Sequence, residues 1–361
     1  MHRVFLRVFS VLATFALVGA FAGGATAIAA SDTAGAVYTQ TNKAANAVLV
    51  FARAADGSLS APTSVATGGS GSGTGLGSQG SVTVSADGRW LFVVNAGSDS
   101  ISSFAIRGHD LSLIGVVPSG GHQPISVTAS GGVAYVLNAG TPNISGFSVG
   151  ASGLAPLAGS TAALPSGSAP AQIQFSRSGN VLIVTEKATS ALQTFTVDAN
   201  GLAHAASTTA SNGTTPFGFA VGLRGEIFVT EAAASTASSY IVSDAGTLTT
   251  VTASAATNEK AACWAAVTKN GRYLFTANAA SDSISTFAVA PGGALSLVAT
   301  TRLATAAHPL DLAVSESGQN VYVLESNPQR IGAFAIGADG TLTEITGATS
   351  PLMGDGGLAA R

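Results

Sequence analysis

The stretch Ser81-Val-Thr-Val-Ser-Ala-Asp-Gly-Arg-Trp-Leu-Phe-Val-Val-Asn95 recurs further along the chain as Trp264-Ala-Ala-Val-Thr-Lys-Asn-Gly-Arg-Tyr-Leu-Phe-Thr-Ala-Asn278. Each copy has the pattern of a short strand, a tight turn and a second strand rich in β-formers. The turns contain Gly88 and Gly271, and glycine readily adopts the positive φ of a tight hairpin turn. Weaker copies begin at Ala171, Phe217 and Leu310. We therefore expect a chain built from repeats.

An aromatic residue near the end of each repeat sets the length of the unit. Seven positions share this feature: Phe51, Phe104, Phe147, Phe195, Tyr240, Phe287 and Phe334. Their mean separation is about 47 residues, which is in the range of propeller blades. In the second unit we expect strands at 81–85, 89–95, 100–106 and 111–117. Seven such units predict an all-β, seven-bladed β-propeller with four antiparallel strands in each blade.

The two ends of the repeat region are predicted to meet in one blade. The first unit begins at Ala36-Val-Tyr-Thr-Gln40, which matches a second strand, so its innermost strand is missing. The tail 351–361 contains Gly357-Leu-Ala-Ala360, which is similar to an innermost strand such as Pro124-Ile-Ser-Val127. We expect the C-terminal strand to complete the first blade, because ring closure removes free sheet edges.

The composition excludes several classes of protein. Charged residues make up 9 % of the chain and its net charge is -3, with no basic cluster, so a nucleic-acid partner is not expected. The hydrophobic fraction of 46 % excludes a disordered chain. Cys263 is the single cysteine, so no disulfide framework can form. We interpret it as a small buried residue.

The first thirty residues have the pattern of a secretory signal peptide. Arg3 and Arg7 precede an apolar run over 8–22, and Ala27-Ile28-Ala29 resembles a cleavage site. A membrane anchor is the alternative, but the apolar run is short for a span. We therefore expect residues 31–361 to form one propeller domain that is secreted or periplasmic, not inserted in a membrane, and monomeric.

A Gly/Ser-rich stretch over 68–80 lengthens the first repeat. Its composition is typical of a flexible linker, which is the interpretation we favour. The alternative is a mobile cover over one face of the ring.

Propeller geometry predicts one face for any chemistry. The loops before the inner strand and after the second strand of each blade share that face. We expect the catalytic residues there to be Glu186, Glu231, His122 and His308, with substrate-binding residues Asn95, Asn138, Gln123, Gln172, Phe217, Trp264, Asn278 and Glu325. Glutamates and histidines beside amide donors are suited to acid–base work on an ester or lactone.

Structural interpretations of the same residues remain open. Asn95, Asn138 and Asn278 can bond loop backbone without any role in catalysis. His122 and His308 each lie at or near a proline in a turn. No metal motif with tight ligand spacing is present, so no cofactor is expected, although the oxygens of the mouth are compatible with a weakly bound divalent cation.

Three segments resemble the repeat of a known family: Ser85-Ala-Asp-Gly-Arg-Trp-Leu-Phe-Val-Val-Asn95, Ala134-Tyr-Val-Leu-Asn138 and Asn320-Val-Tyr-Val-Leu324. They look like the lactonase-type seven-bladed propellers, which include 6-phosphogluconolactonase and carboxymuconate cyclase and overlap the YVTN-repeat proteins. The resemblance implies lactone hydrolysis or its reverse, with His, Glu and Arg at the channel mouth. His122 and His308 match its histidine position, and Glu186 or Glu231 could match the acid. Gln123 and Leu310 stand where a basic residue would be expected.

The leading hypothesis is an exported lactonase-like hydrolase acting on a small lactone. In it, Glu186 or Glu231 activates water and His122 or His308 donates the proton. The alternative is a non-catalytic propeller that binds a small molecule or a protein on the same face. A third hypothesis is a secreted scaffold for envelope or matrix interactions.

Overall fold

The computed structural model describes Met1 and residues 35–327, 329–345 and 356–361. The chain divides into two units, Met1–Ser31 and Asp32–Arg361, and the following account concerns the second. The predicted signal peptide, apart from Met1, and residues 351–355 of the predicted closing tail lie outside the described residues.

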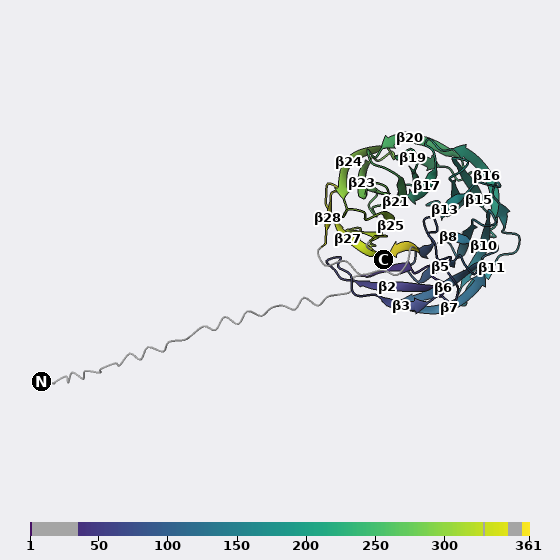
Figure 1. The fold of residues 1–361 in the computed structure, drawn as a ribbon, viewed down its shortest axis with the longest axis horizontal. Helices are drawn as coiled ribbons and strands as arrows, with labels where there is room; N and C mark the ends of the chain where they lie inside the picture. Colours follow the sequence, from purple (N-terminus) through teal and green to yellow (C-terminus); the bar gives the residue numbers. More distant parts are fainter. Residues whose placement is uncertain (2–34, 328, 346–355) are drawn as a thin grey trace. The chain divides into compact units, whose positions relative to one another are not determined.

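Seven antiparallel sheets surround a central axis, and each has a path of four strands (Figure 1). Blade 1 contains β29 (Gly356–Ala360), β1 (Gly35–Gln40), β2 (Ala47–Arg53) and β3 (Thr63–Ala66), in this order from the inside. Blade 2 contains β4 (Val82–Val84), β5 (Trp90–Asn95), β6 (Ser100–Arg107) and β7 (Asp110–Pro118). Blade 3 contains β8 (Pro124–Ser130), β9 (Val133–Asn138), β10 (Asn143–Gly150), β11 (Gly153–Pro156) and a short extra strand, β12 (Ala162–Ala163). The predicted seven-bladed propeller is confirmed.

The remaining blades repeat the same order along the chain. Blade 4 contains β13 (Pro170–Phe175), β14 (Val181–Glu186), β15 (Ala191–Val197) and β16 (Ala203–Ala210). Blade 5 contains β17 (Pro216–Val221), β18 (Glu226–Glu231), β19 (Thr236–Val242) and β20 (Leu248–Ala256). Blade 6 contains β21 (Ala262–Val267), β22 (Tyr273–Asn278), β23 (Ser283–Val289) and β24 (Leu295–Arg302). Blade 7 contains β25 (Pro309–Val314), β26 (Asn320–Glu325), β27 (Arg330–Ile336) and β28 (Leu342–Glu344).

The core lies between neighbouring blades. The second strands are buried along nearly their whole length, as in β14 and β22, because blades pack on both of their faces. The outermost strands alternate in exposure, as in β24. All seven repeat aromatics lie in third strands and are at most 2 % exposed. Phe104 of blade 2, for example, packs in one cluster with Tyr38 and Val50 of blade 1.

The C-terminal strand closes the ring as predicted. β29 pairs antiparallel with β1, with Thr39 opposite Leu358 and Val37 opposite Ala360. The backbone N–H of Arg361 also donates to the carbonyl of Ala36 at 2.9 Å. Blade 1 therefore joins residues from both ends of the repeat region. None of the described residues forms a helix long and apolar enough to cross a membrane.

Candidate functional site

The residues that end the second strands are buried, and segments that connect the blades pack against several of them. Six of the predicted site residues belong to this group and are at most 1 % exposed: Asn95, Asn138, Glu186, Glu231, Asn278 and Glu325. A Cβ added to Gly121 would be 2.8 Å from the Asn138 side chain, and one on Gly213 would be 2.7 Å from that of Glu231. None of the six lines the central channel. The chain entering blades 3 and 5 therefore packs against the ends of their second strands, at Asn138 and Glu231, and a place at the channel mouth stays a prediction for the six residues.

The three asparagines of this group anchor the second strand of each blade to its surroundings. Asn95 Nδ2 donates to Ser102 Oγ at 2.8 Å, and Asn278 Nδ2 donates to Ser285 Oγ at 2.9 Å. Asn138 Nδ2 donates to Asn143 Oδ1 at 2.8 Å. These bonds join second strands to third strands, which is the structural interpretation of the group. A role in positioning a substrate stays a prediction.

The three glutamates differ in how fully their oxygens are bonded. Burial raises the pKa of all three carboxyls. Glu231 accepts from the hydroxyls of Ser211 and Ser238 on Oε1 and from Thr236 on Oε2. Glu325 accepts two bonds from the Arg330 guanidinium, at 2.8 and 3.2 Å. Glu186 accepts from Thr189 on Oε2 at 2.6 Å, whereas its buried Oε1 has no partner among the described residues. Glu186 is therefore the member of this set with an oxygen left for another ligand.

The two predicted histidines lie on the surface of the loops that precede inner strands. His122 pairs with Asp99 at 2.7 Å, and its side chain is 75 % exposed. The backbone N–H of Gln123, which is itself exposed, donates to the same Asp99. His308 has a φ of 43°, and its N–H donates to Asp282 in the same way. In the described structure neither imidazole bonds to Glu186 or Glu231.

The Gly/Ser-rich stretch 68–80 is not a free linker. We call its last part, residues 75–80, the plug, because it crosses the loop end of the channel. Ser78 Oγ donates to the carbonyl of Ile125 at 2.9 Å, and Trp264 Nε1 donates to the carbonyl of Ser78 at 2.9 Å. Lys187 Nζ donates to the carbonyl of Gly77 at 2.7 Å. The linker interpretation is wrong, because polar contacts to blades 3, 4 and 6 hold the segment in place.

Two of the predicted binding residues meet beside the plug. The rings of Phe217 and Trp264 pack edge to face at 5.0 Å, and Lys187 Nζ lies 5.2 Å from the centre of the Phe217 ring. Burial lowers the pKa of Lys187. Cys263 is buried as expected, and burial raises the pKa of its thiol to about 12, which disfavours the reactive thiolate.

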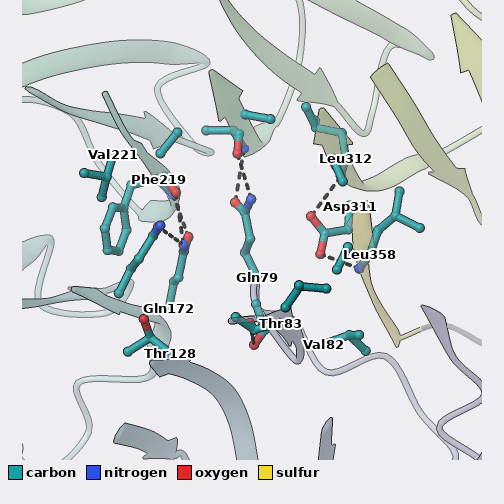
Figure 2. A pocket seen from close by; sticks show the side chains of 18 of the residues that line it. Gln79, Val82, Thr83, Thr128, Gln172, Phe219, Val221, Asp311, Leu312 and Leu358 are labelled. Atoms are coloured by element: carbon teal, nitrogen blue, oxygen red, sulfur yellow. Dashed lines mark hydrogen bonds between the residues drawn. The ribbon is translucent and has the colours of Figure 1, made fainter. Parts of the chain in front are cut away.

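Inside the channel, two glutamine amides replace missing strand partners (Figure 2). Gln172 Oε1 accepts the N–H of Phe219 at 2.7 Å, and its Nε2 donates to the carbonyl of the same residue at 3.0 Å. Gln79 of the plug makes the equivalent pair of bonds to Ala265. Inner strands have an unpaired edge facing the channel, so both amides satisfy buried backbone groups. Gln172 thus lies in the channel wall with its amide already bonded, and its predicted role in binding substrate stays a prediction.

Asp311 is a buried carboxyl on the inner strand of blade 7. It is 2 % exposed and accepts the N–H groups of Leu312 and Leu358 at 2.8 and 3.0 Å (Figure 2). The N–H of Gly80 also bonds to it. Burial nevertheless raises its pKa to about 7, because desolvation outweighs these three bonds.

Two cavities meet at Asp311. The channel cavity of about 270 Å³ is lined by residues of all seven inner strands and by Gln79. A second cavity of about 250 Å³, which we call the plug cavity, lies between the plug and residues such as Trp264, Leu310 and Leu324. Among the residues that the structure describes, Asp311 is the one ionisable side chain that lines either. Over the part of the chain that the structure describes, no group of three or more His, Cys, Asp or Glu side chains is placed to hold a metal ion.

Comparison with known families agrees with this architecture. The family described as "Lactonase, 7-bladed beta-propeller" matches residues 28–167 and 243–351, well over half of the chain. The chain belongs to this family. No curated protein sequence matches it at a significant level.

Solved structures show how widely this lactonase-family fold is shared. A periplasmic gluconolactonase from Pseudomonas aeruginosa is 20 % identical with a TM-score of 0.71, over 88 % of this chain and 98 % of the other. A provisionally assigned 6-phosphogluconolactonase from Bacteroides fragilis is 18 % identical with a TM-score of 0.69, over 90 % and 97 %. A protein from Lactobacillus plantarum is 16 % identical with a TM-score of 0.72, over 90 % and 98 %. At these identities the likeness concerns the fold.

Sequence reasoning missed three residues that the structure brings to the centre of this lactonase-family propeller: Gln79, Lys187 and Asp311. Asp311 had a readable signal, because it is the one Asp, Glu, Lys, Arg or His residue in the seven inner strands. Gln79 had no sequence signal beyond its place in the inserted stretch 68–80, because its partner Ala265 is distant in sequence. Lys187 directly follows the predicted Glu186, and its contact with Gly77 depends on the plug.

Proposed function

We propose that this chain is an exported hydrolase that opens a small, uncharged lactone and acts as a monomer. The observation that carries the proposal is the match to the lactonase family over residues 28–167 and 243–351. Hydrolysis of a lactone by water needs a base, a proton donor and no cofactor. The fold supplies several desolvated carboxyls whose pKa is raised toward the range of a general base, among them Glu186 and Asp311.

An uncharged substrate is supported by the lining of the two central cavities. Within the described parts of the chain, no Lys, Arg or His side chain lines either cavity. Phosphate groups and clustered carboxylates are usually bound by such cations. A sugar phosphate or a tricarboxylate would therefore find no partner for its charge there.

The catalytic roles assigned from the sequence remain proposals. Glu186 is favoured over Glu231 as the base, because its Oε1 has no partner whereas both oxygens of Glu231 are bonded. His122 and His308 are exposed and accessible as proton donors. Substrate-binding roles are kept for the predicted polar and aromatic residues, namely Asn95, Asn138, Gln123, Gln172, Phe217, Trp264, Asn278 and Glu325.

Export is supported by the signal-like pattern of residues 1–30. The periplasmic location named for the Pseudomonas aeruginosa structure points the same way. A secreted or periplasmic enzyme would meet extracellular lactones and would be separated from cytosolic sugar phosphates.

A second candidate is a non-catalytic propeller that binds a small molecule or a protein. The plug favours it, because its contacts to Ile125, Lys187 and Trp264 close the loop end of the channel. In that case the loop face would serve as a binding surface and the channel as a structural axis.

The deciding experiment is a pH-stat assay of the purified chain, begun after residue 30, on a panel of uncharged lactones. Glu186→Gln, Glu231→Gln and His122→Ala are assayed beside the parent protein. Hydrolysis above the uncatalysed rate supports the proposal, and its absence across the panel favours the binding protein. Full activity in all three variants would move the catalytic site away from these residues.

A further inference from the structure

The plug cavity combines an apolar wall with the polar side chains of Ser78, Ser81 and Asp311. Leu76, Leu310, Leu324 and Trp264 supply apolar surface, and Asp311 is the only ionisable group that the described residues contribute to the lining. Gly75 and Gly77 are exposed, so the cavity reaches the surface beside the plug. Its volume of about 250 Å³ is at the small end of ligand sites.

One of these polar side chains, that of Ser81, lacks a hydrogen-bond partner among the described residues. Ser81 is 1 % exposed, so its hydroxyl is buried. A buried hydroxyl without a partner is costly, so the Ser81 hydroxyl is available to a group that binds in the cavity. The carbonyl oxygen of a ligand would be an acceptor for it.

We propose that the plug cavity is the substrate site, that it takes an uncharged lactone with an aliphatic side chain, and that Asp311 and Ser81 act on the lactone carbonyl. This inference rests on the proposed hydrolase function and specifies its substrate class and its catalytic residues. It replaces Glu186 as the base, because Glu186 lines neither the plug cavity nor the channel.

The reaction at this site follows from the two groups. The ionised Asp311 takes a proton from a water molecule while the water oxygen bonds to the lactone carbonyl carbon. The Ser81 hydroxyl donates a hydrogen bond to the carbonyl oxygen, where negative charge develops. The ring C–O bond then breaks, and the proton held by Asp311 passes to the alkoxide. The product is a hydroxy acid, which loses a proton to solvent, and Asp311 returns to its ionised form.

The position of Asp311 suits this role. It lines both cavities, so water can reach it from the channel while the lactone occupies the plug cavity. No other titratable side chain of residues 35–327, 329–345 and 356–361 lines either cavity, and the groups bonded to Asp311 are the backbone N–H groups of Gly80, Leu312 and Leu358. The pH profile of the reaction should therefore report this carboxyl.

The apolar wall sets the expected preference for substrate. Burial of each methylene tightens binding about fourfold. The butyl group of γ-octalactone should thus lower its KM relative to γ-butyrolactone by a factor on the order of 100. A polyhydroxylated lactone such as gluconolactone should bind poorly, because its hydroxyls would lose water without gaining partners.

The first test measures binding without turnover. The probe is 2-butylcyclopentanone, a cyclic ketone that cannot be hydrolysed, and the readout is the fluorescence of Trp264 in a Trp90→Phe background, checked by calorimetry. Gly75 lines the cavity and a Cβ there would meet nothing within 4 Å, so Gly75→Phe should narrow the cavity without strain. We expect at least tenfold weaker binding in Gly75→Phe. The matched control, Gly292→Phe, also adds its ring in open space, away from the cavity, and should bind as the parent does.

The second test measures hydrolysis of γ-octalactone. Ser81→Ala should lower kcat with little change in KM and keep the pH profile. Asp311→Asn should abolish turnover while the ketone still binds, and its melting temperature shows whether it has folded. If Asp311→Asn does not fold, the test rests on Gly75→Phe. Its rate of γ-octalactone hydrolysis should then fall in parallel with its affinity for the ketone.

The outcomes separate this inference from the proposed function. Normal hydrolysis in Asp311→Asn or in Gly75→Phe, or equal KM values for the two lactones, overturns the inference and leaves the hydrolase intact. Binding of the ketone without hydrolysis of any lactone overturns the hydrolase function and the roles of Asp311 and Ser81. Failure of the parent protein to bind the ketone removes the plug cavity as the site.

Discussion

The side-chain amide of Gln79 crosses the channel and bonds to both backbone groups of Ala265. Its Nε2 lies 2.7 Å from the carbonyl oxygen, and its Oε1 accepts the N–H at 3.1 Å. Gln172 makes the same pair of bonds to Phe219 of the neighbouring blade. Blade 5 has Gly218 at the position that Gln172 occupies in blade 4, so a residue of the plug supplies what blade 5 lacks.

We expect Gln79→Ala to destabilise the protein. Both backbone groups of Ala265 would lose their partner in a buried place, which should lower the free energy of unfolding by about 1–3 kcal/mol. Thermal melting and denaturant titration measure the change. Gln319→Ala, at an exposed side chain with no hydrogen bond in the described structure, is the control and should melt within error of the parent. Equal stability of both variants would show that the plug does not hold the channel.

Gly218→Ala should displace the plug. A Cβ at this position would lie 2.1 Å from Gln79 Oε1 and 2.7 Å from the Cys263 carbonyl. The variant should be less stable by about 1–3 kcal/mol, as in other overpacked sites. Addition of Gln79→Ala should recover part of this loss, since one of the two clashes disappears. A double-mutant cycle measures the coupling, and additive effects would contradict the contact.

Removal of residues 356–361 should open the ring. The deletion removes β29 from blade 1 and takes away the burial of Leu358, which is 6 % exposed. Loss of one such leucine typically lowers stability by about 3 kcal/mol. The melting temperature should therefore fall by at least about 6 °C. A truncated protein that melts like the parent would show that β29 does not close the blade.

The carboxyl of Asp311 should make stability depend on pH between about 4 and 7. Its pKa is about 7 in the folded chain and 3.8 in the reference state, so in this window the folded chain holds a proton that the unfolded chain has lost. Stability from this group is thus complete below pH 3.8 and is lost as the pH rises through 7. The loss is on the order of 4 kcal/mol.

Melting temperatures of the parent and of Asp311→Asn across pH 4–8 isolate this contribution, because the other acids are common to both. The difference between the two proteins should change over that range. A constant difference would show that Asp311 does not titrate there.

Glu231→Gln should cost more stability than Glu186→Gln. All three hydroxyl donors to Glu231 meet acceptor oxygens, and an amide NH₂ would face at least one of them. We expect a loss of about 1–3 kcal/mol for Glu231→Gln. Glu186 has one bonded and one unpartnered oxygen, so its amide can turn its NH₂ to the unpartnered side. Chemical denaturation of the pair measures the contrast, and equal losses would mean that the free oxygen has a partner.

Periodic features of this chain were readable from sequence because they repeat. The copies at Ser81 and Trp264, the seven aromatics and the turn glycines each recur with the blade length. An innermost strand was also recognisable in the tail, and β29 is found where it was expected. Repetition makes each of these signals visible several times, so one ambiguous copy does not hide it.

The candidate site was less predictable, because residues sharing a position in the repeat need not share a cavity. Glu186 and Glu231 end second strands as expected, yet both are buried, and the segment at Gly213 packs against Glu231. The ends of the second strands were assigned correctly, but the surroundings of a side chain there depend on which segment packs against it.

The sequence by itself determined the seven blades, their four strands and the closing strand, because these follow from local β-preference and from hydrophobic patterns repeated along the chain. Only the tertiary structure decided that residues 75–80 form a plug, that Gln79 bonds to Ala265, and that Asp311 lies between two cavities. Those facts depend on contacts between residues far apart in the chain and present once each. No periodic pattern encodes them, and they arise only when the ring closes and brings the inner strands within hydrogen-bond distance of the plug.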